Sequence, residues 1–294
     1  MGTSASSKGP GGGVPMVPPW VPPLPPASPN TPQDGDGAGL TDGGQDGQSP
    51  TAPNQSAPQQ PAQAQPSPIA QAARFGGARL NLGKFGQGGD RRDMQRGLRA
   101  YVRKGYGGRA TAVRRFGGTA STAGALYGAL SNVAGGQAAA PGSPLDPALL
   151  AGRSAREVMD AVVEAVRPAD GTQDAEASRA AIKDALSELL TTFPDADLLN
   201  LTEDQRGTAI ELFVAIDVYQ RAMLDIGKAI QEKAPTATVG LSRLKEVKEY
   251  VKQTVAAAFR KLHGAGHRMT TGRVNEVVRA ALEETFQVFE DYRR

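Results

Sequence analysis

The amino-acid sequence predicts an all-α protein: a helical bundle preceded by a basic helical pair and a long disordered N-terminal arm rich in Pro and Gly. Two observations predict this fold class. From residue 90 onward apolar residues recur at helical spacing, without the two-residue alternation that marks β-strands. In contrast, residues 1–73 hold 16 of the 22 prolines and few bulky apolar side chains. We therefore expect three regions: 1–73, 74–135 and 144–294.

The arm, residues 1–73, has too few apolar groups to fold alone. Burying them cannot offset the roughly 1–2 kcal/mol of backbone entropy that each ordered residue loses. The proline run around Trp20 favours extended polyproline II, and the Gln/Pro/Ala-rich stretch after it is typical of a flexible tether. Trp20 is the only Trp of the chain. It is either an anchor for a partner or an exposed residue of a linker.

The next segment is strongly basic. Residues 74–115 carry ten Arg and two Lys against two Asp, a net charge of +10. The apolar spacing predicts one helix from Asp90 that ends at the glycines after residue 104. A second helix is expected over residues 109–133, with a kink or a break at Gly117 and Gly118.

A block this basic predicts an acidic partner. Two interpretations stay open: an acidic protein surface, or nucleic acid, whose bases would stack on aromatic side chains of the same block. The preference for Arg over Lys fits both, because guanidinium binds carboxylate and phosphate equally well in pairs of hydrogen bonds. The candidate stacking residues are Phe75, Phe85, Tyr101, Tyr106 and Phe116. The candidate basic residues are Arg91, Arg92, Arg96, Arg99, Arg103, Lys104, Arg109, Arg114 and Arg115.

The C-terminal region, residues 144–294, reads as a bundle of about five helices. Ser154 followed by Glu157 is a capping box, which marks a helix start. Thr202 is expected to begin a long helix that runs to about residue 233, and Thr271 to cap the last one. Helices in between are predicted over about 175–193 and 241–262, each with an apolar face.

The motifs of common enzymes are missing. The absence of Cys excludes disulfides and thiolate metal sites, and neither a P-loop nor a Gly-x-Ser-x-Gly elbow occurs. His263 and His267 are four apart, but glycines between them favour two residues near a helix C-terminus over a metal pair. We expect no enzyme activity, no metal and no cofactor of its own. No run of 18 apolar residues and no secretory signal occurs, which predicts a cytoplasmic protein that does not enter a membrane.

The N-terminus offers a chemical group. Met1 followed by Gly2 is a sequence from which the initiator Met is normally removed, which exposes the amine of Gly2. An α-amine has a pKa of about 7.7–8, so a good fraction is neutral and nucleophilic near pH 7. The same residues match an N-myristoylation pattern. A terminus with no role is the third alternative.

Several segments resemble the QatB family. They are the opening residues 1–7, the stretches GPGGGVP at 9–15 and VPPW at 17–20, and the segments YVRKGYGG at 101–108 and RRFG at 114–117. QatB is the component without a known enzymatic fold in the four-component Qat anti-phage defence system of bacteria. Its companions are an ATPase, a QueC-like enzyme and a TatD-like nuclease.

This resemblance implies a specific chemistry. QueC-like enzymes use ATP to activate a 7-deazaguanine carboxylate and pass it to a nitrogen nucleophile. The implied acceptor is Gly2, which would carry a covalent 7-deazaguanine adduct after loss of Met1. Thr3, Ser4 and Trp20 would be recognised by the QueC-like partner, and the helical body would assemble with the ATPase and the TatD-like nuclease. Myristoylation does not fit a bacterial family, because bacteria lack that pathway.

Overall fold

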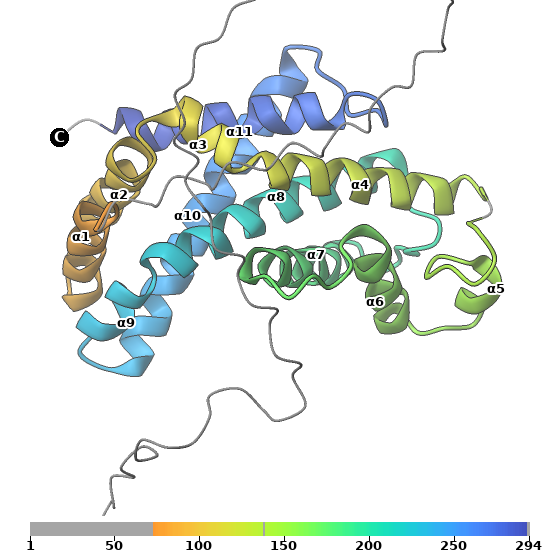
Figure 1. Ribbon diagram of the computed structural model, residues 1–294, viewed down its shortest axis with the longest axis horizontal. Helices are drawn as coiled ribbons and strands as arrows, with labels where there is room; N and C mark the ends of the chain where they lie inside the picture. The colour runs from red at the N-terminus through yellow and green to blue at the C-terminus, as the bar shows by residue number, and fades with distance from the viewer. Residues whose placement is uncertain (1–72, 138, 293–294) are drawn as a thin grey trace, which may run out of the picture. The chain divides into compact units, whose positions relative to one another are not determined.

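A computed structural model describes residues 73–137 and 139–292, which belong to one compact unit, residues 66–294 (Figure 1). The predicted arm lies outside the described residues. Within them the fold is all-α, with no strand, as predicted. The elements are α1 (Gly76–Gln87), α2 (Arg91–Ala100), the π-helix η1 (Tyr101–Gly105), α3 (Arg109–Arg115), α4 (Gly117–Ala134), α5 (Pro147–Leu150), α6 (Ala155–Val166), α7 (Gln173–Thr192), α8 (Glu203–Ile226), α9 (Lys228–Lys233), α10 (Ala237–Gly264) and α11 (Val274–Asp291).

Helix α8 occupies the centre of the fold. It packs against α4, α7 and α10, which surround it in Figure 1. Its buried side chains include Ile210, Phe213 and Val214 on a broad apolar face. Helix α11 lies against both α4 and α10. The long helices therefore share one interior, in which the aliphatic and aromatic side chains of both predicted helical regions form a continuous core.

The caps of the C-terminal region match the sequence prediction at two of three positions. Ser154 and Glu157 form the expected capping box of α6, and Thr202 forms a second one with Gln205 on α8. The prediction for Thr271 is wrong. The last helix begins three residues later, after Arg273, and no side chain caps it. Its first turn is instead anchored by Val274, which is fully buried.

Glycines split two of the predicted helices. The helix expected over 109–133 is divided at Phe116 into α3 and α4, just before the glycine pair Gly117–Gly118. The helix expected over 202–233 is divided at Gly227 into α8 and α9. A Cβ atom at Gly227 would lie only 2.7 Å from the carbonyl oxygen of Met223, so this bend requires glycine.

Helix α1 was not predicted, because its sequence is rich in glycine and has no side-chain cap. Tertiary packing explains it. A Cβ atom at Gly86 would meet the Ile230 carbonyl oxygen at 2.7 Å, where α1 crosses α9. On α2, a Cβ atom at Gly97 would meet the side chain of Leu82 at 2.7 Å. Glycine thus lets the backbones approach closely, and the contacts offset its low helix propensity.

No helix within the described ranges has an apolar stretch sufficient to span a lipid bilayer.

Candidate functional site

Four of the nine predicted basic residues gather around one hollow. Arg96 and Arg99 of α2, with Arg103 and Lys104 of η1, line a depression of about 590 Å³. Their spacing of three, four and one residues places them along one side of the continuous α2–η1 segment. The rest of the lining consists of Asn81, Ala100 and Tyr292. The hollow is therefore strongly cationic, and no carboxylate of the described residues lines it.

The other five basic residues lie apart from this hollow. The Arg91 guanidinium lies 5.2 Å from the ring centre of Tyr250, in a cation–π contact with α10. Arg109 faces α11, where its Nε lies 3.9 Å from Glu283. Arg114 donates a hydrogen bond to Thr111 at 2.9 Å. The remaining two, Arg92 and Arg115, are exposed.

Most of the predicted stacking residues are buried and cannot contact nucleic acid. Phe75, Phe85, Tyr101 and Phe116 are at most 5% exposed, so four of the five cannot reach a base. The fifth, Tyr106, is partly buried among them. The expectation that these rings stack on bases is therefore wrong for the four buried residues. Their clustering is explained by core packing, since aromatic rings bury the largest apolar areas of the segment.

Most of these aromatic side chains form a chain of contacts around the π-helix. The rings of Phe75 and Tyr101 stack at 5.1 Å, and Tyr101 meets Tyr106 edge-to-face at 5.1 Å. Tyr106 continues to Phe116 at 6.0 Å. Gly105 is required at this place, because a Cβ atom there would overlap the Phe75 ring at 2.4 Å. The cluster thereby fixes the wide turn of η1.

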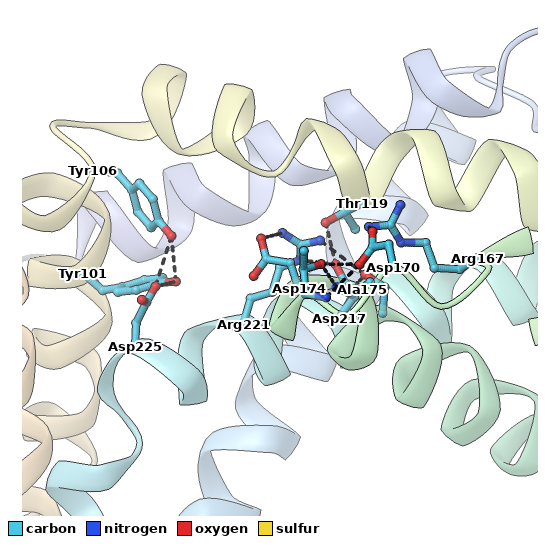
Figure 2. Close-up of polar contacts among 12 residues, drawn as sticks. Tyr101, Tyr106, Thr119, Arg167, Asp170, Asp174, Ala175, Asp217, Arg221 and Asp225 are labelled. Carbon is cyan, nitrogen blue, oxygen red and sulfur yellow. Dashed lines mark hydrogen bonds and ion pairs between the residues drawn. The ribbon is translucent and has the colours of Figure 1, made fainter. Parts of the chain in front are cut away.

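Hydrogen bonds to Asp225 of α8 also hold η1 in place, as Figure 2 shows. The hydroxyl groups of Tyr101 and Tyr106 donate to the Asp225 carboxylate of α8, at 2.9 and 3.2 Å. The backbone carbonyl of Asp225 accepts two further bonds from the Arg79 guanidinium, at 2.8 and 3.0 Å. One residue of α8 therefore ties both α1 and η1 to the bundle.

Burial changes the acidity of these phenols. Loss of hydration raises the pKa of Tyr101 well above its usual value, and the neighbouring Tyr106 and Asp225 add to the effect. Loss of hydration likewise raises the pKa of Tyr106 to about 12. Both groups are neutral hydrogen-bond donors at any physiological pH, which is the form that this contact with a carboxylate requires.

A second polar cluster is centred on Asp217, about two turns before Asp225 on α8 (Figure 2). The carboxylate of Asp217 is fully buried and accepts bonds from Thr119 at 2.5 Å, Ser178 at 2.7 Å and Arg221 at 2.9 Å. Arg221 also pairs with the exposed Asp174 at 3.2 Å. These contacts join α4, α7 and α8 at one point.

Asp217 and Arg221 lie on the long helix predicted to begin at Thr202, but this cluster was not predicted. A signal existed, because an Asp four residues before an Arg within an otherwise apolar run indicates a paired buried charge. Its partners Thr119 and Ser178 come from distant segments and carry no such signal. Each polar group of the cluster has a partner, so its arrangement is that of a structural network.

The two histidines lie near a helix end, as predicted. His263 belongs to the last turn of α10 and His267 follows that helix. They line a shallow hollow together with Glu203, Asp204 and Glu211. Among residues 73–137 and 139–292, no group of His, Asp and Glu side chains is placed to hold a metal ion.

The predicted residues of the arm, Gly2, Thr3, Ser4 and Trp20, lie outside the described residues.

Comparison with protein families gives a match. The family model described as "Qat anti-phage system associated protein QatB" matches residues 107–289. This range covers α3 to most of α11 and includes the Asp217 cluster. It begins just after Lys104, the last of the basic residues that line the hollow. Neither the curated proteins nor the solved structures contain a match to the chain. Because the family model spans more than half of the sequence, this chain belongs to the QatB family of the Qat anti-phage system.

Proposed function

We propose that this chain is a non-catalytic component of the Qat defence complex, and that its N-terminal glycine is the acceptor in a conjugation reaction. The observation that carries the proposal is the family match over residues 107–289, because it assigns the chain to a multi-component anti-phage system. The chain acts in the cytoplasm. A QueC-like enzyme supplies the activated 7-deazaguanine, and the helical body assembles with the ATPase and the TatD-like nuclease.

The reaction uses the amine of Gly2 after removal of Met1. The neutral amine attacks the activated carboxyl carbon of the 7-deazaguanine, an amide bond forms, the activating group leaves with the bonding electrons, and the nitrogen loses a proton. The α-amine suits this step, since a pKa of about 7.7–8 leaves it partly unprotonated near pH 7. The lysine nearest to it, Lys8, has a side chain with an ordinary pKa of about 10.4 and is almost fully protonated there.

The arm's sequence supports delivery of this amine to another protein. The small residues Thr3 and Ser4 fit a narrow channel, and Trp20 offers one large apolar side chain for docking. The described helical body supports a scaffold role, since its two internal polar clusters, around Asp217 and Asp225, are used in joining helices.

The test is intact-mass analysis of the chain after co-expression with the QueC-like partner. We expect a mass increase equal to one 7-deazaguanine acyl group, located by peptide mapping on Gly2. A Gly2→Glu variant is the matched control, because the large second residue keeps Met1 in place and the glycine amine is lost. An unmodified N-terminus beside an active partner would overturn the proposal, as would an adduct on Lys8.

The alternative is a nucleic-acid-binding adaptor. Its candidate basic residues lie outside the core, but most of its candidate stacking residues are buried in it. It predicts binding to DNA or RNA that weakens steeply with salt, because phosphate contacts release counterions. It also predicts loss of that binding when Arg91, Arg92, Arg114 and Arg115 are replaced by Ala. Binding that is absent or insensitive to salt would remove this alternative.

A further inference from the structure

We propose that the hollow lined by Arg96, Arg99, Arg103 and Lys104 is a binding site for the di- or triphosphate chain of a small ligand. This site is on the helical body and is independent of the conjugation of Gly2. The phosphate chain belongs either to a nucleotide or to inorganic polyphosphate, and the experiment below separates these two sources.

Charge is the first reason. Four cationic side chains line one depression, and the remaining lining residues, Asn81, Ala100 and Tyr292, are neutral. Of these four cations, Arg96 alone has an ion-pair partner among the described residues, Asp93 of its own helix at 3.4 Å. Like charges that line one depression repel one another. A multiply charged anion removes that repulsion and gains several charge-assisted hydrogen bonds at once.

The hydrogen-bonding state of Arg99 is the second reason. Its Nε atom is buried and has no partner among the described residues. A buried donor without an acceptor destabilises the protein, and more so when the donor is charged. Two neutral donors lie nearby. The Asn81 side-chain amide gives one N–H to the Gly77 carbonyl at 2.7 Å, and its second N–H is left for a ligand. Tyr292, another lining residue, has a phenol hydroxyl that can donate a hydrogen bond.

Rigidity is the third reason. Arg103 and Lys104 are carried by the π-helix η1, a rare structure that often marks functional sites. Its wide turn includes the bond from the Tyr106 N–H to the Tyr101 carbonyl at 3.2 Å. The aromatic cluster and Asp225 hold that turn from the inside. The cations are thus presented by a backbone fixed in advance, which lowers the entropic cost of binding.

Size and surroundings favour a small phosphate ligand over nucleic acid. A volume of about 590 Å³ lies within the range of about 300–1,000 Å³ that is typical of small-molecule sites. A nucleic-acid surface would instead be extended, and the other five basic residues of the segment do not line the hollow. The rings that would stack on bases are mostly buried.

The experiment is calorimetric titration of the full chain at low salt with inorganic tripolyphosphate, ATP and adenosine. We expect tripolyphosphate and ATP to bind and adenosine not to bind. The double variant Arg99→Gln with Arg103→Gln should weaken tripolyphosphate binding at least about tenfold, since it removes two cations and their charge-assisted hydrogen bonds. Arg114→Gln with Arg115→Gln is the matched control. It removes the same charge outside the hollow and should change the affinity less than about twofold.

Equal affinity for ATP and tripolyphosphate assigns the site to a bare phosphate chain, and tighter binding of ATP assigns it to a nucleotide. No binding of either one overturns the proposal, as does an equal loss in the control variant. Displacement of tripolyphosphate by a single-stranded oligonucleotide without terminal phosphates, at lower concentration, also overturns it in favour of nucleic acid. Circular dichroism checks the fold of the double variant, and Arg103→Gln alone serves if Arg99→Gln unfolds the chain. The result does not depend on whether Gly2 is modified.

Discussion

The two helical regions of this protein, residues 74–135 and 144–294, are stabilised in different ways. In the C-terminal region α6, α7, α8 and α10 each begin with a Ser or Thr whose side chain accepts a backbone N–H. In the N-terminal region only α2 has such a cap, from Asp90, whereas α1, α3 and α4 begin without any such bond. There the helices depend on close backbone approach at glycine and on aromatic packing.

This difference separates local from tertiary determinants of a helix. A side-chain cap acts within four residues and contributes about 0.5–2 kcal/mol wherever the helix packs. A glycine contact stabilises nothing until the partner helix is in place. The N-terminal region should therefore depend on the C-terminal region for its stability more than the reverse. The two are connected at α8, through Asp217 and Asp225.

Removing the connection at Asp217 should have the largest effect. Asp217→Ala leaves Arg221, whose side chain is only 13% exposed, without its buried carboxylate partner, and removes the acceptor of the Thr119 and Ser178 hydroxyl groups. Breaking one side of a buried ion pair costs about 3–5 kcal/mol. We expect that loss in the free energy of unfolding, measured by urea denaturation.

Asp174→Ala is the control for this prediction, because Asp174 pairs with the same Arg221 but its side chain is 67% exposed. An exposed pair contributes at most about 1 kcal/mol. Equal losses in the two variants would mean that burial of Asp217 has no special role.

The glycine contact between α1 and α9 should have the next largest effect. Gly86→Ala places a methyl group 2.7 Å from the Ile230 carbonyl oxygen, a backbone atom that cannot rotate away. Such overpacking costs about 1–3 kcal/mol. In Gly128→Ala the new methyl group meets nothing within 4 Å, and it should raise the stability by about 0.5–1 kcal/mol through helix propensity. Thermal denaturation followed by circular dichroism measures both. Stabilisation by both substitutions would show that α1 does not need its close contact.

The difference between local and tertiary determinants also decides which features could be predicted from the sequence. The capping box at Ser154 and the apolar face of α10 are local patterns, and both are confirmed. Helix α1 could not be predicted, because Gly83 and Gly86 have a role only opposite α9. The basic residues were identified by type, but only the fold shows that four of them meet at one hollow. The aromatic residues of the same segment could belong either to a core or to a stacking surface, and the sequence does not distinguish the two. Their burial is seen only in the structure.

High pH should weaken the contact between the two regions at Asp225. Tyr101 and Tyr106 keep their protons in the folded state above pH 10, whereas in the unfolded chain they ionise near pH 10. The stabilising contribution is complete below pH 10 and is lost as pH rises toward 12. The slope is at most about 1.4 kcal/mol per pH unit for each tyrosine, and less for Tyr106 because it is partly exposed.

Urea denaturation at pH 9, 10 and 11 measures this loss. Tyr106→Phe is the matched control, since it keeps the ring in the cluster and removes the ionising group, and it should show a shallower decline. An unchanged decline would assign the pH dependence to other groups.

The smallest effect is expected at a cap of the C-terminal region. Ser154→Ala removes the oxygen that accepts the Glu157 N–H at 3.4 Å, and the cost of losing such a cap is typically about 1 kcal/mol. Ser154→Gly should lower the free energy of unfolding by only a few tenths of a kcal/mol, because glycine leaves the N-terminal N–H groups open to water. The exposed Ser187, in the interior of α7, is the control: Ser187→Ala should be neutral or slightly stabilising. If Ser154→Ala costs nothing by urea denaturation, then α6 is held by packing alone, and the local determinants that distinguish the C-terminal region from the glycine-rich one have no energetic weight there.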